Sequence, residues 1–170
     1  MVLAVSDSDV LIHFAKLNQL KLLKNQFSMI FLSEIVYSET VSEGIRLQKE
    51  DAYTIKKFIE SEEIITIRKA ELEDVNDLIK KHHIRKGEAS IIALAKEKKI
   101  EYCLTNEIKV RKVIKAEGLK VIGTLGIILR AYKMKKIDKN ESLTLLENIQ
   151  MNSIEYRIHP KLIEKIKEKI

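Results

Sequence analysis

The chain of 170 residues has little of what usually cross-links or interrupts a fold: one cysteine, one proline, five glycines and no tryptophan. A single cysteine excludes an internal disulfide, and Cys103 lies in an apolar run that favours a buried structural thiol. The scarcity of proline and glycine predicts long helices joined by short turns. No apolar run is long enough to span a bilayer, and the first residues lack the features of a signal peptide. We therefore expect a cytoplasmic protein that does not enter a membrane.

The composition is that of a globular chain, with 45% hydrophobic and 33% charged residues, which excludes an intrinsically disordered protein. At this length one domain is the default, here covering residues 1–170. The net charge of +6 suits a polyanionic partner such as RNA or DNA, although many basic proteins have no such partner.

Short apolar runs alternate with segments of helical periodicity along the chain. This alternation predicts an α/β fold with a mainly parallel central sheet. Strands are expected at 2–5, 29–32, 64–67, 102–105 and 120–122. Helices are expected at 9–17, 20–27, 33–44, 50–61, 72–83, from 87 onward, 106–118, after 126, 140–151 and 161–170. The helices from about 139 to 170 are expected to form an appendage to the single domain.

The stretch from Val2 to Phe14 combines a buried strand with the start of a helix. Asp7 follows the strand directly, and Asp9 is placed to cap the helix. Open parallel sheets bind their ligands at the carboxyl ends of strands. The sequence therefore predicts that Asp7 faces a ligand-binding edge.

Further acids occupy comparable positions: Glu88 at a helix start, Glu107 after the fourth strand, and Glu39 on the helix after the second strand. Acids at helix starts also complement the helix dipole, and Glu39 could be an ordinary solvated residue. If the acids converge, each raises the pKa of the others unless a cation neutralises them. Oxygen ligands without a Cys or His cluster select Mg²⁺ or Mn²⁺, ions that support phosphoryl-transfer hydrolysis.

Five blocks taken together resemble the PIN-domain family, and within it the uncharacterised prokaryotic branch related to VapC-type toxins. The resemblance runs from about Val2 to Lys135 and rests on the blocks 7–12, 36–39, 87–89, 104–107 and 123–126. It implies a three-layer α/β/α sandwich and Mg²⁺- or Mn²⁺-dependent endonucleolytic cleavage of single-stranded RNA. It also implies an antitoxin protein as a candidate partner, and homodimerisation is common among similar proteins.

The same resemblance assigns roles to individual residues. It implies metal ligation by Asp7, Glu39, Glu88 and Glu107, and a supporting role for Ser8, Thr105 and Asn106. Two departures from the family pattern stand out. Glu107 replaces the more usual Asp, which predicts weaker activity or a preference for Mn²⁺. Asp9 adds a negative charge that either binds a second metal or caps the helix.

Basic residues follow Glu107 on one helix, and a second basic cluster covers 130–136. Lys109, Arg111 and Lys112 are candidate phosphate-binding residues, with solvated helix faces as the alternative. The apolar stripe at 127–132 is expected to be core or a dimer face.

Two rival functions stay open at this point. The first is a catalytically degenerate module that binds RNA or a protein, with Glu107 as the sign of lost catalysis. The second is a haloacid-dehalogenase-type phosphatase, because 7–9 also resembles the nucleophile motif of that family. The phosphatase would need a downstream acidic pair, and none of the remaining aspartates follows an apolar strand.

Overall fold

A computed structural model describes residues 2–170 and contains one five-stranded sheet in this part of the chain. The strand order is β3-β2-β1-β4-β5, and every neighbouring pair is parallel. All five strands lie where the sequence predicts them: β1 Leu3–Ser6, β2 Met29–Ser33, β3 Ile65–Arg68, β4 Tyr102–Leu104 and β5 Lys120–Ile122. The predicted parallel α/β sheet is confirmed.

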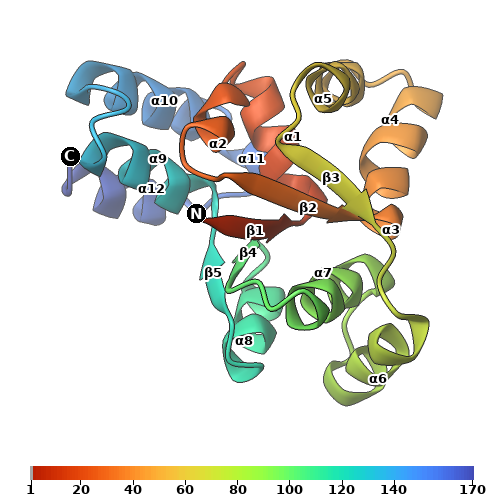
Figure 1. Ribbon diagram of the computed structural model, residues 1–170. Coiled ribbons are helices and arrows are strands. Elements are labelled where there is room, and N and C mark those ends of the chain that lie inside the picture. Colours follow the sequence, from red (N-terminus) through yellow and green to blue (C-terminus); the bar gives the residue numbers. More distant parts are fainter. Residues whose placement is uncertain (1) are drawn as a thin grey trace.

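Helices cover both faces of the sheet, as Figure 1 shows. One face carries α6 (Leu72–His82), α7 (Lys86–Glu97) and α8 (Ile108–Ala116). The opposite face carries α1 (Ser8–Lys16), α2 (Lys21–Lys24), α5 (Glu50–Ser61) and α9 (Thr124–Lys133). This arrangement confirms the three-layer α/β/α sandwich. No helix among residues 2–170 is long and apolar enough to cross a membrane.

The topology creates one switch point, between β1 and β4. The chain steps outward from β1 to β2 and β3, and then crosses to β4 on the other side of β1. Ser6 pairs with Leu104, and the backbone N–H of Asp7 donates to the carbonyl of Leu104 at 2.8 Å. The residues that follow both strands therefore begin side by side, where open α/β sheets place their ligands.

The segment after β2 is one continuous helical stretch, made of α3 (Glu34–Tyr37), the π-helix η1 (Ser38–Ser42) and α4 (Glu43–Arg46). The prediction that Gly44 ends this helix is wrong. A Cβ at Gly44 would lie 2.5 Å from the Cβ of Ala52, so the glycine allows α5 to pack closely. The π-turn, a feature frequent at functional sites, was not visible in the sequence.

The C-terminal helices pack on α9 and on each other: α10 (Lys139–Met151), α11 (Ser153–Tyr156) and α12 (Pro160–Lys167). They help to bury Ile127, Ile128 and Ala131, which are fully inaccessible to solvent. Of the two predictions for the stripe at 127–132, core is therefore correct for these residues. The short helix α11 was not predicted.

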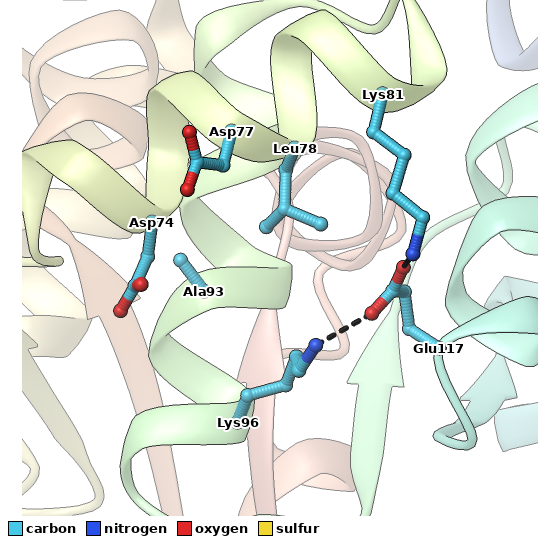
Figure 2. A pocket seen from close by; sticks show the side chains of 7 residues that line it. All are labelled: Asp74, Asp77, Leu78, Lys81, Ala93, Lys96 and Glu117. Carbon is cyan, nitrogen blue, oxygen red and sulfur yellow. Dashed lines mark hydrogen bonds and ion pairs between the residues drawn. The ribbon is translucent and has the colours of Figure 1, made fainter.

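A network of ion pairs fastens α6 and α7 to the end of α8. Glu117 accepts from Lys81 at 2.8 Å, from His82 at 2.7 Å and from Lys96 at 2.5 Å. These hydrogen bonds, that of Lys81 first, lower the pKa of Glu117 to about 2. Figure 2 shows Lys81 and Lys96 converging on Glu117 beside a cavity of 270 Å³ that is also lined by Asp74 and Asp77. Lys81 and Lys96 are both paired with Glu117, so the role of this network is to hold α6, α7 and the end of α8 together.

Candidate active site

Asp7 lies at the switch point and is held by two hydrogen bonds. It is the N-cap of α1, and its Oδ1 accepts from the backbone N–H of Ser8 at 2.8 Å. Its Oδ2 accepts from the hydroxyl of Thr105 at 3.1 Å. Ser8 and Thr105 thus both support Asp7, Ser8 through its main chain. Burial is the largest effect on Asp7 and raises its pKa above the ordinary value.

Asp9 does not cap the helix, so that prediction is wrong: Asp7 is the cap, and Asp9 lies in the first turn of α1. Its Oδ2 accepts from the backbone N–H of Asn106 at 2.8 Å. Its Oδ1 is buried and has no hydrogen-bond partner among residues 2–170. Burial, with repulsion from Asp7 as the next cause, raises the pKa of Asp9 to about 7.

Glu39 lies on the π-helix η1, and its carboxylate contacts the start of α7. A Cβ on Gly87 would lie 2.7 Å from one Glu39 carboxylate oxygen and 3.1 Å from the other. Partial burial raises the pKa of Glu39, and the charges of Asp7 and Glu88 raise it further. Asp7, Glu39 and Glu88 are therefore close enough to repel one another.

Two buried serines fix the distance between these helices. The hydroxyl of Ser90 on α7 donates to the carbonyl of Gly87 at 2.6 Å. Ser33, the N-cap of α3, accepts from the N–H of Val36 at 3.0 Å, and its Oγ lies 2.6 Å from that of Ser90. Because the Ser90 proton is used, Ser33 must donate to Ser90. This bridge holds the segment that carries Glu39 against the segment that carries Glu88.

Glu88 is buried in the first turn of α7 and is paired with Arg85. Its Oε2 accepts from the backbone N–H of Arg85 at 2.8 Å, and its Oε1 accepts from the Arg85 Nε at 2.7 Å. The positive charge of Arg85 also acts on Asp7 and Glu39, where it offsets part of the increase in their pKa values. Sequence reasoning missed Arg85, although a residue three before Glu88 is the expected partner in a capping box.

Glu107 is the N-cap residue of α8 and is exposed. It lines an open cleft of 380 Å³ together with Arg85, Glu88 and Lys109. The structure thus places Glu107 on the same cleft as Glu88, on the β4 side of the switch point.

The described residues include no group of three or more His, Cys, Asp or Glu arranged to hold a metal ion. The chemistry of the acids nevertheless suits a divalent cation. The carboxylates are oxygen donors, three of them have raised pKa values, and Asp9 Oδ1 is an orphaned buried oxygen. The residues therefore fit such a cation, provided that the Glu88–Arg85 pair opens.

Comparison with known proteins identifies the family of the chain. A family model, DUF3368, described as a PIN domain, matches residues 3–170. The chain belongs to the PIN-domain family. The resemblance drawn from the sequence motifs is thereby confirmed, and the match includes the C-terminal helices. No curated protein matches the sequence.

Two solved structures share the fold of this PIN domain. PAE2754 from Pyrobaculum aerophilum aligns with a TM-score of 0.58 and 14% identity, covering 76% of this chain and 94% of its own. VapC20 from Mycobacterium tuberculosis, a sarcin-ricin loop cleaving toxin, aligns with a TM-score of 0.51 and 11% identity, covering 65% of this chain and 94% of its own. At these identities the likeness establishes the fold alone.

The basic residues of α8 take different positions in this PIN domain. Arg111 is partly buried, and its Nη1 donates to the carbonyl of Thr105 at 3.0 Å, so it braces the loop after β4. Lys109 reaches across to the carbonyl of His83 at 2.5 Å and borders the cleft. Lys112 is exposed and does not line the cleft. Of the three candidate phosphate-binding residues, Lys109 is the one beside Glu88.

A polar network supports the site, and of its three members only Asn106 was predicted from the sequence to have a supporting role. Asn106 binds Thr124 through both ends of its side chain: its Oδ1 accepts from the Thr124 N–H at 2.8 Å, and its Nδ2 donates to the Thr124 hydroxyl at 3.0 Å. That hydroxyl lies 2.9 Å from Nδ1 of His13, which is 6% exposed. His13, on the helix after β1, carried no recognisable signal because its partners lie about a hundred residues away.

The contact between Gly87 and Glu39 yields a prediction for this PIN domain. A Gly87→Ala substitution places a methyl group where the Glu39 carboxylate lies, so the carboxylate must move away. We expect the affinity for Mn²⁺ to fall by roughly 10-fold, the lower end of the effect of disturbing a ligand's surroundings. Stability should change little, because the end of a flexible side chain can shift.

Isothermal titration calorimetry with Mn²⁺ measures this effect. Ala89→Gly, two residues further along α7, is the control for the altered backbone. Unchanged affinity in Gly87→Ala would show that Glu39 takes no part in cation binding.

Proposed function

We propose that this PIN domain is a metal-dependent endoribonuclease that hydrolyses single-stranded RNA. The observation that carries the proposal is that Asp7, Glu39 and Glu88 lie close enough together at the switch point for their negative charges to repel one another. The pKa values of Asp7 and Glu39 are raised, and such acids at the ligand-binding edge of a sheet are characteristic of functional sites. The likeness in fold to VapC20, a sarcin-ricin loop cleaving toxin, supports RNA as the substrate.

Asp7, Glu39 and Glu88 would hold a Mg²⁺ or Mn²⁺ ion, with Glu107 beside them and Asp9 available for a second ion. When bound, the cation supplies positive charge that stabilises the charge developing on the phosphate. Thr105 and Ser8 orient Asp7, and the Ser33–Ser90 bridge orients Glu39. The protein's own part is thus to fix the oxygen donors before substrate arrives.

Arg85 and Lys109 border the same cleft and would bind the phosphates of the RNA strand. Arg85 can exchange the carboxylate of Glu88 for a phosphate, which releases Glu88 for the cation. Water then attacks phosphorus, the bond to O3′ breaks, and the proton passes to the leaving oxygen. The products carry a 5′-phosphate and a 3′-hydroxyl. The corresponding cellular role is that of a toxin held in check by an antitoxin protein.

A second function is favoured by specific observations. Glu88 is already neutralised by Arg85, and Glu107 is exposed, unlike Asp7 and Glu88. A domain of this kind could bind RNA without cleaving it. The phosphatase alternative is set aside by the family match. Homodimerisation stays a prediction, and Ile127, Ile128 and Ala131 are not available for it because they are buried within the chain.

End-labelled single-stranded RNA, incubated with Mg²⁺, Mn²⁺ or EDTA, tests the proposal. We expect cleavage only with a cation and a loss of more than about 100-fold in Asp7→Asn, since even residues that merely support metal ligands cost 10–100-fold. Asp74→Asn, at an exposed acid away from the site, is the matched control. Binding of RNA by wild type without cleavage under any condition would establish the binding module instead.

A further inference from the structure

A bridge of three polar side chains adjoins the candidate site: His13 on α1, Asn106 after β4 and Thr124 at the start of α9. Thr124 is fully buried and His13 is 6% exposed. No chemistry of the proposed reaction needs these residues. Their hydrogen bonds join α1, the loop after β4 and the start of α9.

The protons of the bridge follow from its geometry. Asn106 uses its amide to donate to the Thr124 oxygen and its carbonyl oxygen to accept the Thr124 backbone N–H. The amide nitrogen of Asn106, which can only donate, also lies 3.3 Å from Nδ1 of His13, so Nδ1 is an acceptor and can take the hydroxyl proton of Thr124 as well. His13 is therefore neutral, with its proton on Nε2. Burial is the main reason that the pKa of His13 falls to about 4, which keeps the ring in this state.

The bridge ends at the acids. The backbone N–H of Asn106 donates to Asp9 Oδ2, and the preceding residue, Thr105, donates to Asp7. The Asn106 side chain therefore fixes the peptide that presents hydrogen bonds to both carboxylates. Gly123 makes room for it, since a Cβ there would lie 2.6 Å from Asn106 Oδ1. A displaced Asn106 would release Asp9 and disturb the loop that holds Asp7.

The opposite end of the bridge reaches the C-terminal helices. The ring of Tyr156, at the end of α11, meets the ring of His13 edge-on with centroids 5.0 Å apart. Tyr156 is 3% exposed and covers the ring of His13, so the Thr124–His13 hydrogen bond is shielded from water. Water excluded in this way cannot replace the Thr124–His13 hydrogen bond, which makes the geometry of the bridge rigid.

We propose that His13, Thr124 and Asn106 are positioning residues that hold Asp9 and Asp7 in the arrangement required for cation binding. This inference rests on the cation site of the proposed function. It predicts that breaking the bridge lowers cation affinity although none of its side chains is a cation ligand. Support of this kind for metal ligands is typically worth 10–100-fold in affinity.

The test compares Mn²⁺ binding, measured by calorimetry without RNA, in two variants of one residue. Thr124→Val keeps the shape of the side chain and removes the hydroxyl, so we expect affinity to fall by about 10-fold or more. Thr124→Ser restores the hydroxyl and should restore most of the affinity. The NMR signals of the Asn106 side-chain amide should shift in Thr124→Val and return close to their wild-type positions in Thr124→Ser.

A purely structural role is separated by Ser142→Ala. Ser142 is also fully buried, and its hydroxyl donates to the Asp138 carbonyl at 2.7 Å, far along the chain from the acids. This variant should lose stability, as Thr124→Val does, and keep full Mn²⁺ affinity. The proposal is overturned if Thr124→Val binds Mn²⁺ as wild type does, if Ser142→Ala loses affinity equally, or if wild type binds no Mn²⁺. Mn²⁺ binding by wild type without RNA cleavage refutes the nuclease function and leaves the positioning proposal standing or falling on Thr124→Val.

Discussion

Replacing Asp9 with Asn is expected to stabilise the cation-free protein by about 2–4 kcal/mol at pH 8, although the substitution removes a candidate metal ligand. The reason is the pKa of Asp9, which burial and Asp7 raise from 3.8 to about 7. Between these values the folded protein binds more protons at Asp9 than the unfolded chain does. The folded protein therefore becomes less stable relative to the unfolded chain as pH rises from about 4 to 7, because Asp9 must ionise in a buried position. Asn does not ionise, so the variant does not lose this stability. Asn can still accept the Asn106 N–H, so the hydrogen bond to the loop survives.

Urea unfolding in EDTA at pH 5 and pH 8 measures this effect. The gain in Asp9→Asn should be large at pH 8 and much smaller at pH 5. Asp74→Asn, at an exposed acid, should show no such pH-dependent gain. With saturating Mn²⁺ the advantage should shrink or reverse, because an ion that binds only the folded wild type stabilises it. Equal stability of variant and wild type at pH 8 would contradict the raised pKa.

His13 is expected to produce the opposite pH dependence, of about 3 kcal/mol between pH 7 and pH 4. Burial lowers its pKa from 6.5 to about 4, followed by the charges of Lys16 and Arg157, while Glu155 acts in the other direction. Between these values the unfolded chain binds more protons at this group than the folded protein does. Its contribution to stability is therefore present above about pH 6.5 and is lost as pH falls to 4.

The difference between wild type and His13→Gln isolates this contribution from that of the acids. Gln can accept the Thr124 hydroxyl proton and does not titrate, so the stability of wild type relative to the variant should fall by about 3 kcal/mol from pH 7 to pH 4. His83→Asn is the control, since His83 is exposed and has a positive φ of 52°, which Asn tolerates. An NMR titration of His13 with a midpoint near 6.5 would rule out this explanation.

The elements of the fold could be predicted from the sequence because local patterns determine them. Apolar runs located all five strands, and α5 begins and ends where its periodicity does. Predictions were wrong where a residue of that type commonly has more than one structural role. Gly44 was assigned to a helix end but serves close packing against Ala52, and Asp9 was assigned to a cap that Asp7 provides.

The candidate site was only partly visible for a different reason. The family motifs indicated the acids, but their spacing in three dimensions depends on contacts between distant residues. Thr105 and Asp7 are 98 residues apart, and His13 and Thr124 are 111 apart. The pairing of Glu88 with Arg85 is local and could have been expected from the capping box. The roles of His13 and of the π-turn around Glu39 depend on three-dimensional packing and could not.

The central position of β1 has a consequence for biosynthesis. β1 is made first, yet one of its two neighbours, β4, emerges from the ribosome nearly a hundred residues later. A nascent chain that ends before Thr105 carries Asp7, Glu39 and Glu88 but lacks the strand and loop that hold Asp7 in place. The acids can therefore reach their final arrangement only after β4 and the residues that follow it have been made. If the domain is the nuclease that we propose, a nascent chain is inactive at least until β4 and the loop after it have been made.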